Sequence, residues 1–182
     1  MSTVGWIVIG IVVVAVIVLL AVVLRWRSRA NLQQRFGPEY QREVEARGSE
    51  RDAERHLRDV ANRRDKLDIR QLDAAARERY TQRWQEVQTD FVDQPARALD
   101  EADRLVTDVM KDRGYPVQDF RERAELVAAD HPQVVEHYRA AHAARQRHTP
   151  SQDGAASGAE TEELRQAFVH YRALFEELVH DR

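Results

Sequence analysis

Histidine is the residue type in this sequence with the widest chemical use, because imidazole binds metals and transfers protons near neutral pH. Three of the seven histidines, His131, His137 and His142, fall on one predicted helix at spacings of six and five residues. Two histidines that bind one zinc ion from a single helix are four residues apart, which places both rings on one face. Glu136-His137 is only a fragment of the His-Glu-x-x-His zinc motif. The sequence therefore predicts no metal site.

Other catalytic patterns are equally scarce. The chain has no cysteine and only seven glycines, which argues against thiol catalysis and against a glycine-rich phosphate loop. Carboxylates are abundant, but a general-acid pair needs a pocket that amphipathic helices alone do not indicate. We therefore predict no catalytic residue and no cofactor, and keep a hydrolase or transferase with a site between helices as the alternative. The serines of predicted linkers and caps are Ser28, Ser49, Ser151 and Ser157.

The longest apolar segment runs from Val4 to Leu24 without a charge, and sixteen of its twenty-one residues are Val, Ile or Leu. As a helix rising ~1.5 Å per residue it covers roughly 31 Å, close to the ~30 Å thickness of the hydrocarbon core of a bilayer. Trp6 and Trp26 would then lie one at each membrane interface. The sequence therefore predicts a single transmembrane helix over residues 4–24, after a short N-terminal segment, 1–3.

The residues after the apolar segment are basic, with no acidic residue before Glu39. By the positive-inside rule, this flank places the N-terminus outside and the rest of the chain in the cytoplasm. The expectation is a single-pass protein of the cell membrane, in contact with the lipid bilayer, with a basic juxtamembrane linker over 25–37. The predicted membrane-interface residues are Trp6, Trp26, Arg25, Arg27 and Arg29.

A secreted or envelope protein with a cleaved N-terminal signal is the other interpretation of this segment. Ser28-Arg29-Ala30 offers small residues at the spacing of a cleavage site. Against it, the residues before the apolar segment include no Lys or Arg, and the segment is longer than the ~7–15 residues usual in signal peptides.

Charge is unevenly distributed along the rest of the chain. Residues 25–70 contain thirteen Lys and Arg against nine Asp and Glu, whereas residues 149–182 contain three against seven. The arginines near residue 60 could form a surface for a polyanion or a lipid. Acidic residues are interleaved with them, as in Glu54–Arg58, four residues apart on a helix, and cancel most of the field that nucleic-acid binding needs. We therefore expect no nucleic-acid partner; the arginines concerned are Arg55, Arg58, Arg63 and Arg64.

Beyond residue 37 the apolar residues recur at helical spacing, with no alternating strand pattern. Proline and glycine divide this region into helices, with Pro38 and Pro95 suited to a first helical position and Gly114 to a C-cap. Asp73 is a predicted N-cap. The predicted fold class is all-α: one N-terminal transmembrane helix and a soluble, bundle-like domain of about five or six helices, with its main part at 38–148.

The last predicted helix, 160–182, follows a flexible linker of small residues at 149–159. It has a regular apolar stripe that must be buried. We expect this face to pack onto the domain itself, and the alternative is docking on another protein or on a second copy of the chain. The residues of this possible partner-docking face are Phe168, Tyr171, Leu174, Phe175 and Leu178.

The segment from Ala74 to Gly114, together with Tyr115–Phe120, Asp130-His131-Pro132 and the final helix, resembles an uncharacterised family of small bacterial, largely actinobacterial, proteins. The resemblance covers nearly the whole chain and implies an N-terminal hydrophobic segment followed by a helical remainder. The family carries no assigned activity, so it implies no site residue. The function expected from the sequence is a membrane-anchored, non-enzymatic interaction or scaffold module that binds another protein or itself, with no small-molecule ligand.

Overall fold

The computed structural model describes residues 3–147 and 158–180, which form eight helices and contain no β-strand. This confirms the all-α prediction, although seven helices follow the first instead of the five or six expected. The linker predicted at 149–159 lies largely outside the described residues, as do Met1 and Ser2. The chain divides into two compact units, Met1–Arg58 and Asp59–Arg182. The helices are α1 (Thr3–Phe36), α2 (Pro38–Arg47), α3 (Glu50–Arg64), α4 (Ala74–Asp93), α5 (Pro95–Arg113), α6 (Phe120–Asp130), α7 (Val135–Arg147) and α8 (Gly158–His180).

The transmembrane helix predicted over residues 4–24 is wrong. In the part of the chain that the structure describes, no helix is long and apolar enough to cross a membrane. The helix also continues to Phe36, through the residues 25–36 that the sequence assigns to a linker.

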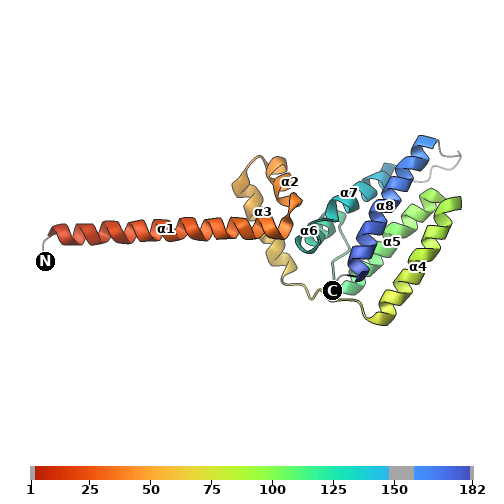
Figure 1. Ribbon diagram of the computed structural model, residues 1–182, viewed down its shortest axis with the longest axis horizontal. Helices are drawn as coiled ribbons and strands as arrows, with labels where there is room; N and C mark the ends of the chain where they lie inside the picture. Colours follow the sequence, from red (N-terminus) through yellow and green to blue (C-terminus); the bar gives the residue numbers. More distant parts are fainter. Residues whose placement is uncertain (1–2, 148–157, 181–182) are drawn as a thin grey trace. The chain divides into compact units, whose positions relative to one another are not determined.

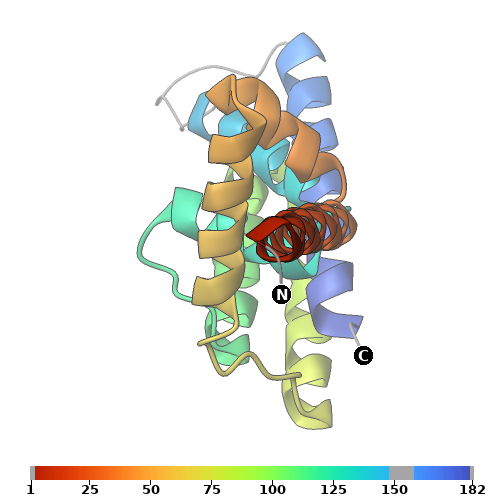
Figure 2. The same ribbon diagram turned by 90° about the vertical axis from the view of Figure 1, so that its left-hand side faces the viewer.

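The first unit contains α1, α2 and most of α3. Gly37, with φ at 48°, ends α1, and Pro38 occupies the start of α2, where its missing N–H is not needed. Gly48 adopts the left-handed conformation after α2 and donates its N–H to the Val44 carbonyl. The chain then turns back, so that α2 and α3 lie side by side (Figures 1 and 2). The buried side chains here include Phe36, Tyr40, Ala53 and Leu57.

The second unit is a bundle in which α8 is the central helix. Figure 1 shows α7, α8, α5 and α4 following one another across the unit. Helix α8 packs mainly on α7 and α5, and α4 packs on α5. The expectation that the last helix packs onto its own domain is therefore confirmed. The largest side chains that are fully buried in this unit include Leu105, Met110, Tyr138, Tyr171 and Leu174.

Local sequence signals determine where these helices begin and end. Asp73 accepts a hydrogen bond from the Ala76 N–H at 2.6 Å, as predicted for an N-cap, and Asp119 caps α6 in the same way. Gly114 ends α5 with φ at 101°. Asp130 is the last residue of α6, and its carboxylate accepts hydrogen bonds from Arg64 and Tyr115.

The C-terminal end of α8 is held by arginines from two other helices. The last carbonyls of a helix have no partner within it, so cationic donors are favourable there. Arg113 of α5 donates to the Leu178 carbonyl at 2.9 Å, and Arg77 of α4 donates to the Val179 carbonyl at 3.0 Å. Both arginines therefore tie α8 to the helices that precede it in the chain.

Candidate anion-binding site

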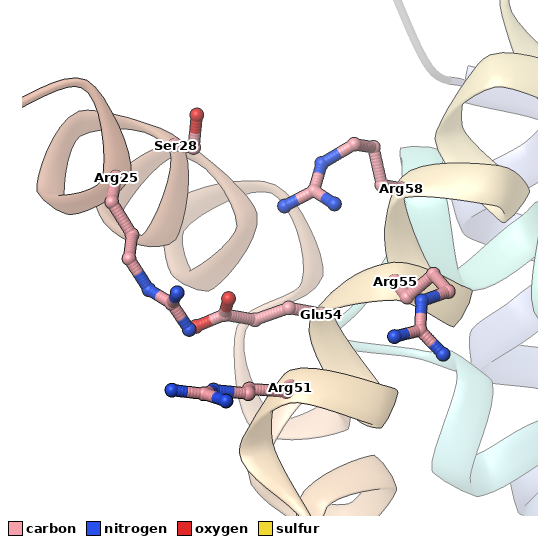
Figure 3. A pocket seen from close by; sticks show the side chains of 6 residues that line it. All are labelled: Arg25, Ser28, Arg51, Glu54, Arg55 and Arg58. Atoms are coloured by element: carbon pink, nitrogen blue, oxygen red, sulfur yellow. The ribbon is translucent and has the colours of Figure 1, made fainter. Parts of the chain in front are cut away.

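A hollow of about 340 Å³ lies between α1 and α3 in the first unit. Figure 3 shows the six side chains that line it, two from α1 and four from α3. Positions three or four residues apart share one face of a helix, which is why both helices present several lining residues to the same space. Four of the six are arginines and one is a glutamate. The lining residues are Arg25, Ser28, Arg51, Glu54, Arg55 and Arg58.

Two of these side chains have partners of their own. Arg55 forms an ion pair with Asp52, at 3.1 Å between Nη1 and Oδ1, and points away from α1 (Figure 3). Glu54 is buried, with only 7% of its surface exposed, and accepts a hydrogen bond from the Tyr40 hydroxyl at 3.3 Å. Burial and this hydrogen bond fix the position of the one carboxylate in the hollow.

The other three arginines are exposed and available. Among the residues that the structure describes, no carboxylate forms an ion pair with Arg25, Arg51 or Arg58. Arginines further along α3 differ: Arg63 pairs with Glu122 and Glu125 of α6. The hollow therefore holds three guanidinium groups that form no ion pair, beside the one carboxylate of Glu54. Guanidinium groups donate paired hydrogen bonds to carboxylate and phosphate oxygens, so this arrangement is suited to binding an anion.

A second hollow of about 380 Å³ is also lined by Arg25 and Glu54. Its other two charged residues, Arg29 and Glu50, form an ion pair with each other. Trp26 also lines it and is 75% exposed. The other side chains that line it are Ala30 and Gln33.

The predicted membrane-interface residues are thus only partly brought together. Arg25 contributes to both hollows, whereas Trp26 and Arg29 line only the second. Arg27 is exposed and lines neither. The side chain of Trp6 lies outside the described residues.

The predicted partner-docking face is covered by the domain itself. Trp84 of α4 stacks on Phe168 and Phe175, with ring centroids 5.2 and 4.6 Å apart. Leu174 is fully buried. Each of the five side chains of this face is at most 8% exposed, so the face belongs to the core of the second unit; they are Phe168, Tyr171, Leu174, Phe175 and Leu178.

A buried polar cluster in the second unit has the residue types of an acid–base site. Asp103 of α5 accepts a hydrogen bond from the Tyr171 hydroxyl at 2.8 Å and lies 3.4 Å from Nε of Arg145. Burial acts to raise the pKa of Asp103, but His142, Tyr171 and the charge of Arg145 outweigh it and hold that pKa below its usual value. Phe120 stacks on His142 at 3.6 Å. The cluster joins α5, α7 and α8.

The sequence did not indicate this cluster. Tyr171 and Asp103 are 68 residues apart and lie on separate helices. Its polar residues share a helix face with apolar residues of α5 and α7, and this pattern is a signal that could have indicated buried polar groups. That signal does not say which helices meet.

A second histidine contact joins α7 to α8. Nδ1 of His137 lies 2.8 Å from Nδ1 of His170, and the two rings are stacked with centroids 4.8 Å apart. Burial and the neighbouring His137 lower the pKa of His170 from its usual 6.5. Protonating both rings would place two like charges in contact, so the pair requires at least one neutral ring.

Acidification is therefore expected to weaken the packing of α8. Because the pKa of His170 is lowered in the folded state, the unfolded chain binds more protons below pH 6.5, and stability falls as the pH decreases from there. Chemical denaturation at pH 7.5 and at pH 5 should show that the free energy of unfolding falls less on acidification in His170→Gln than in the parent chain. His180→Gln, at an exposed position of the same helix, is the control, and an unchanged loss in His170→Gln would contradict the assignment.

No protein-family model matches this chain, and no curated protein or solved structure shows significant similarity to it.

Proposed function

We propose that this chain is a non-enzymatic interaction module, in which a helical domain binds an anionic partner at the hollow between α1 and α3. The observation that supports this most directly is the group of three exposed arginines, Arg25, Arg51 and Arg58, without a carboxylate partner among the described residues. Like charges held together on a surface repel each other, and an anion bound between them relieves that repulsion.

The use of ionisable groups in the second unit supports a binding role over catalysis. Asp103, Tyr171 and Arg145 interact with one another inside the bundle. A hydrolase or transferase would need such groups at the wall of an open site, where they could reach a substrate. Here these groups instead hold three helices together, which favours a scaffold.

Binding at the hollow should depend strongly on salt. The three arginines are exposed, and charges in solvent are screened over a Debye length of about 8 Å at physiological ionic strength. We therefore expect the affinity for an anionic partner to fall as the salt concentration rises, as is typical of surface electrostatics.

The test is the binding of fluorescein-labelled heparin, a probe that carries both sulfate and carboxylate groups, to the full chain. The variant Arg25→Ala/Arg51→Ala/Arg58→Ala is expected to bind at least about tenfold more weakly, equivalent to about 1.4 kcal/mol. The control variant Arg97→Ala/Arg104→Ala/Arg121→Ala removes the same charge from exposed positions of the second unit. An equal loss of affinity in both variants would show that binding depends only on the net charge of the chain, and would contradict a site at the hollow.

A further inference from the structure

We infer that the group bound at this hollow is a phosphate monoester and not a carboxylate, an inference that rests on the proposed function. Three features of the hollow carry it: the directions from which its donors approach, its net charge, and its size.

The donors approach from two helices. Arg25 extends from α1 toward α3, whereas Arg51 and Arg58 extend from α3 on the opposite side of the hollow; the Ser28 hydroxyl points away from Arg25 and Arg51 (Figure 3). Arg51 and Arg58 are seven residues apart, which is about 10 Å along a helix. A carboxylate has two oxygens in one plane, and a single guanidinium fork satisfies both. A phosphate monoester has three terminal oxygens in different directions, so it can accept hydrogen bonds from both helices at once.

The charge of the hollow matches the same group. Arg25, Arg51 and Arg58 contribute three positive charges and Glu54 contributes one negative charge, while Arg55 is neutralised by Asp52. The formal net charge is therefore +2. A phosphate monoester carries about −1.5 to −2 at pH 7, whereas a carboxylate carries only −1. Glu54 is buried and accepts a hydrogen bond from Tyr40, and its negative charge disfavours the additional charges of a polyphosphate.

The size of the hollow leaves room for the group that carries the phosphate. At about 340 Å³ the hollow lies near the lower end of the ~300–1,000 Å³ typical of small-molecule sites. Five of the six residues that line it are exposed, so the carrier of the phosphate can extend into solvent. The carrier can be a soluble metabolite or the diacylglycerol of phosphatidic acid, since both present a phosphate monoester.

The first arm of the test uses the full chain and soluble probes in calorimetric titrations. Glycerol 3-phosphate is expected to bind at least about tenfold more tightly than glycerate, which carries a carboxylate on a similar carbon chain. Arg51→Ala/Arg58→Ala should lose this preference, and Arg104→Ala/Arg121→Ala should keep it. Circular dichroism would establish that each variant keeps its helical content.

The second arm distinguishes the two sources of phosphate. Sedimentation with phosphatidylcholine vesicles that contain phosphatidic acid is compared with vesicles that contain phosphatidylserine at the same surface charge. A preference for phosphatidic acid that disappears in Arg51→Ala/Arg58→Ala assigns the phosphate to a lipid headgroup. Binding of glycerol 3-phosphate without that preference assigns it to a soluble ester.

The outcomes separate this inference from the proposed function. Equal affinity for glycerate and glycerol 3-phosphate, or tighter binding of a polyglutamate peptide, would overturn the phosphate assignment and leave an anion site in place. If heparin binding also proved independent of the three arginines, both the phosphate assignment and the proposed function would be overturned.

Discussion

Replacing Leu174 with alanine is expected to lower the free energy of unfolding by about 3–4 kcal/mol, because it removes a large apolar side chain from a core that cannot refill the space. Leu174 is fully buried on α8, the helix that packs on both α5 and α7. Chemical denaturation followed by circular dichroism measures the change. The midpoint should shift while the dependence on denaturant stays the same.

The matched control is Val169→Ala on the same helix. Val169 is 46% exposed, and surface substitutions of this kind usually change stability by less than about 0.5 kcal/mol. A loss in Leu174→Ala no greater than that in Val169→Ala would mean that α8 does not form part of the core. The same result would restore the docking interpretation of this helix.

The second large effect is expected for Gly114→Ala, which should lower the free energy of unfolding by at least about 2 kcal/mol. The backbone has φ at 101°, a conformation that costs an L-residue with a side chain roughly 1–2 kcal/mol. A Cβ atom would also lie 2.5 Å from the carbonyl oxygen of Asp68. That oxygen belongs to the backbone and cannot rotate away, so the segment before α4 must shift.

Gly48→Ala separates these two contributions. Gly48 also has a positive φ, 65°, but a Cβ atom there would meet nothing within 4 Å. We expect Gly48→Ala to lower the free energy of unfolding by about 1 kcal/mol, because only the backbone conformation is unfavourable there. Denaturation of both variants, together with hydrogen exchange of residues 66–73, tests the difference. Equal costs, with exchange unchanged in this segment, would exclude the contact with Asp68.

Much of the fold was predictable because helix ends depend on local chemistry. Pro38 and Pro95 lack an N–H and suit a first helical position, and Asp73 offers a short carboxylate to an unpaired N–H. Gly114 accepts a positive φ at no steric cost. None of these signals requires knowledge of the rest of the chain. The transmembrane prediction was based on the apolar composition of a window of residues. In the described residues, no helix is long and apolar enough to cross a membrane.

The arginine hollow could not be predicted, because tertiary contacts replaced the local pairs. The sequence predicts an ion pair between Glu54 and Arg58, but such exposed pairs contribute only about 0.3–0.5 kcal/mol. In the structure Glu54 is buried against Tyr40 of α2, and Arg58 lines the hollow. Arg25 comes from a helix more than twenty residues earlier. Which charges remain uncompensated is thus decided by how the helices pack.

The two arginines that hold the end of α8 also bear on how the chain folds during synthesis. The contact of Arg77 with Val179 joins residues 102 positions apart, and that of Arg113 with Leu178 joins residues 65 apart. Contacts across such separations form late, because a long loop must close first. Until the ribosome has released α8, the faces of α5 and α7 that it covers remain exposed to water. We therefore expect the second unit to complete its core only once α8 has docked.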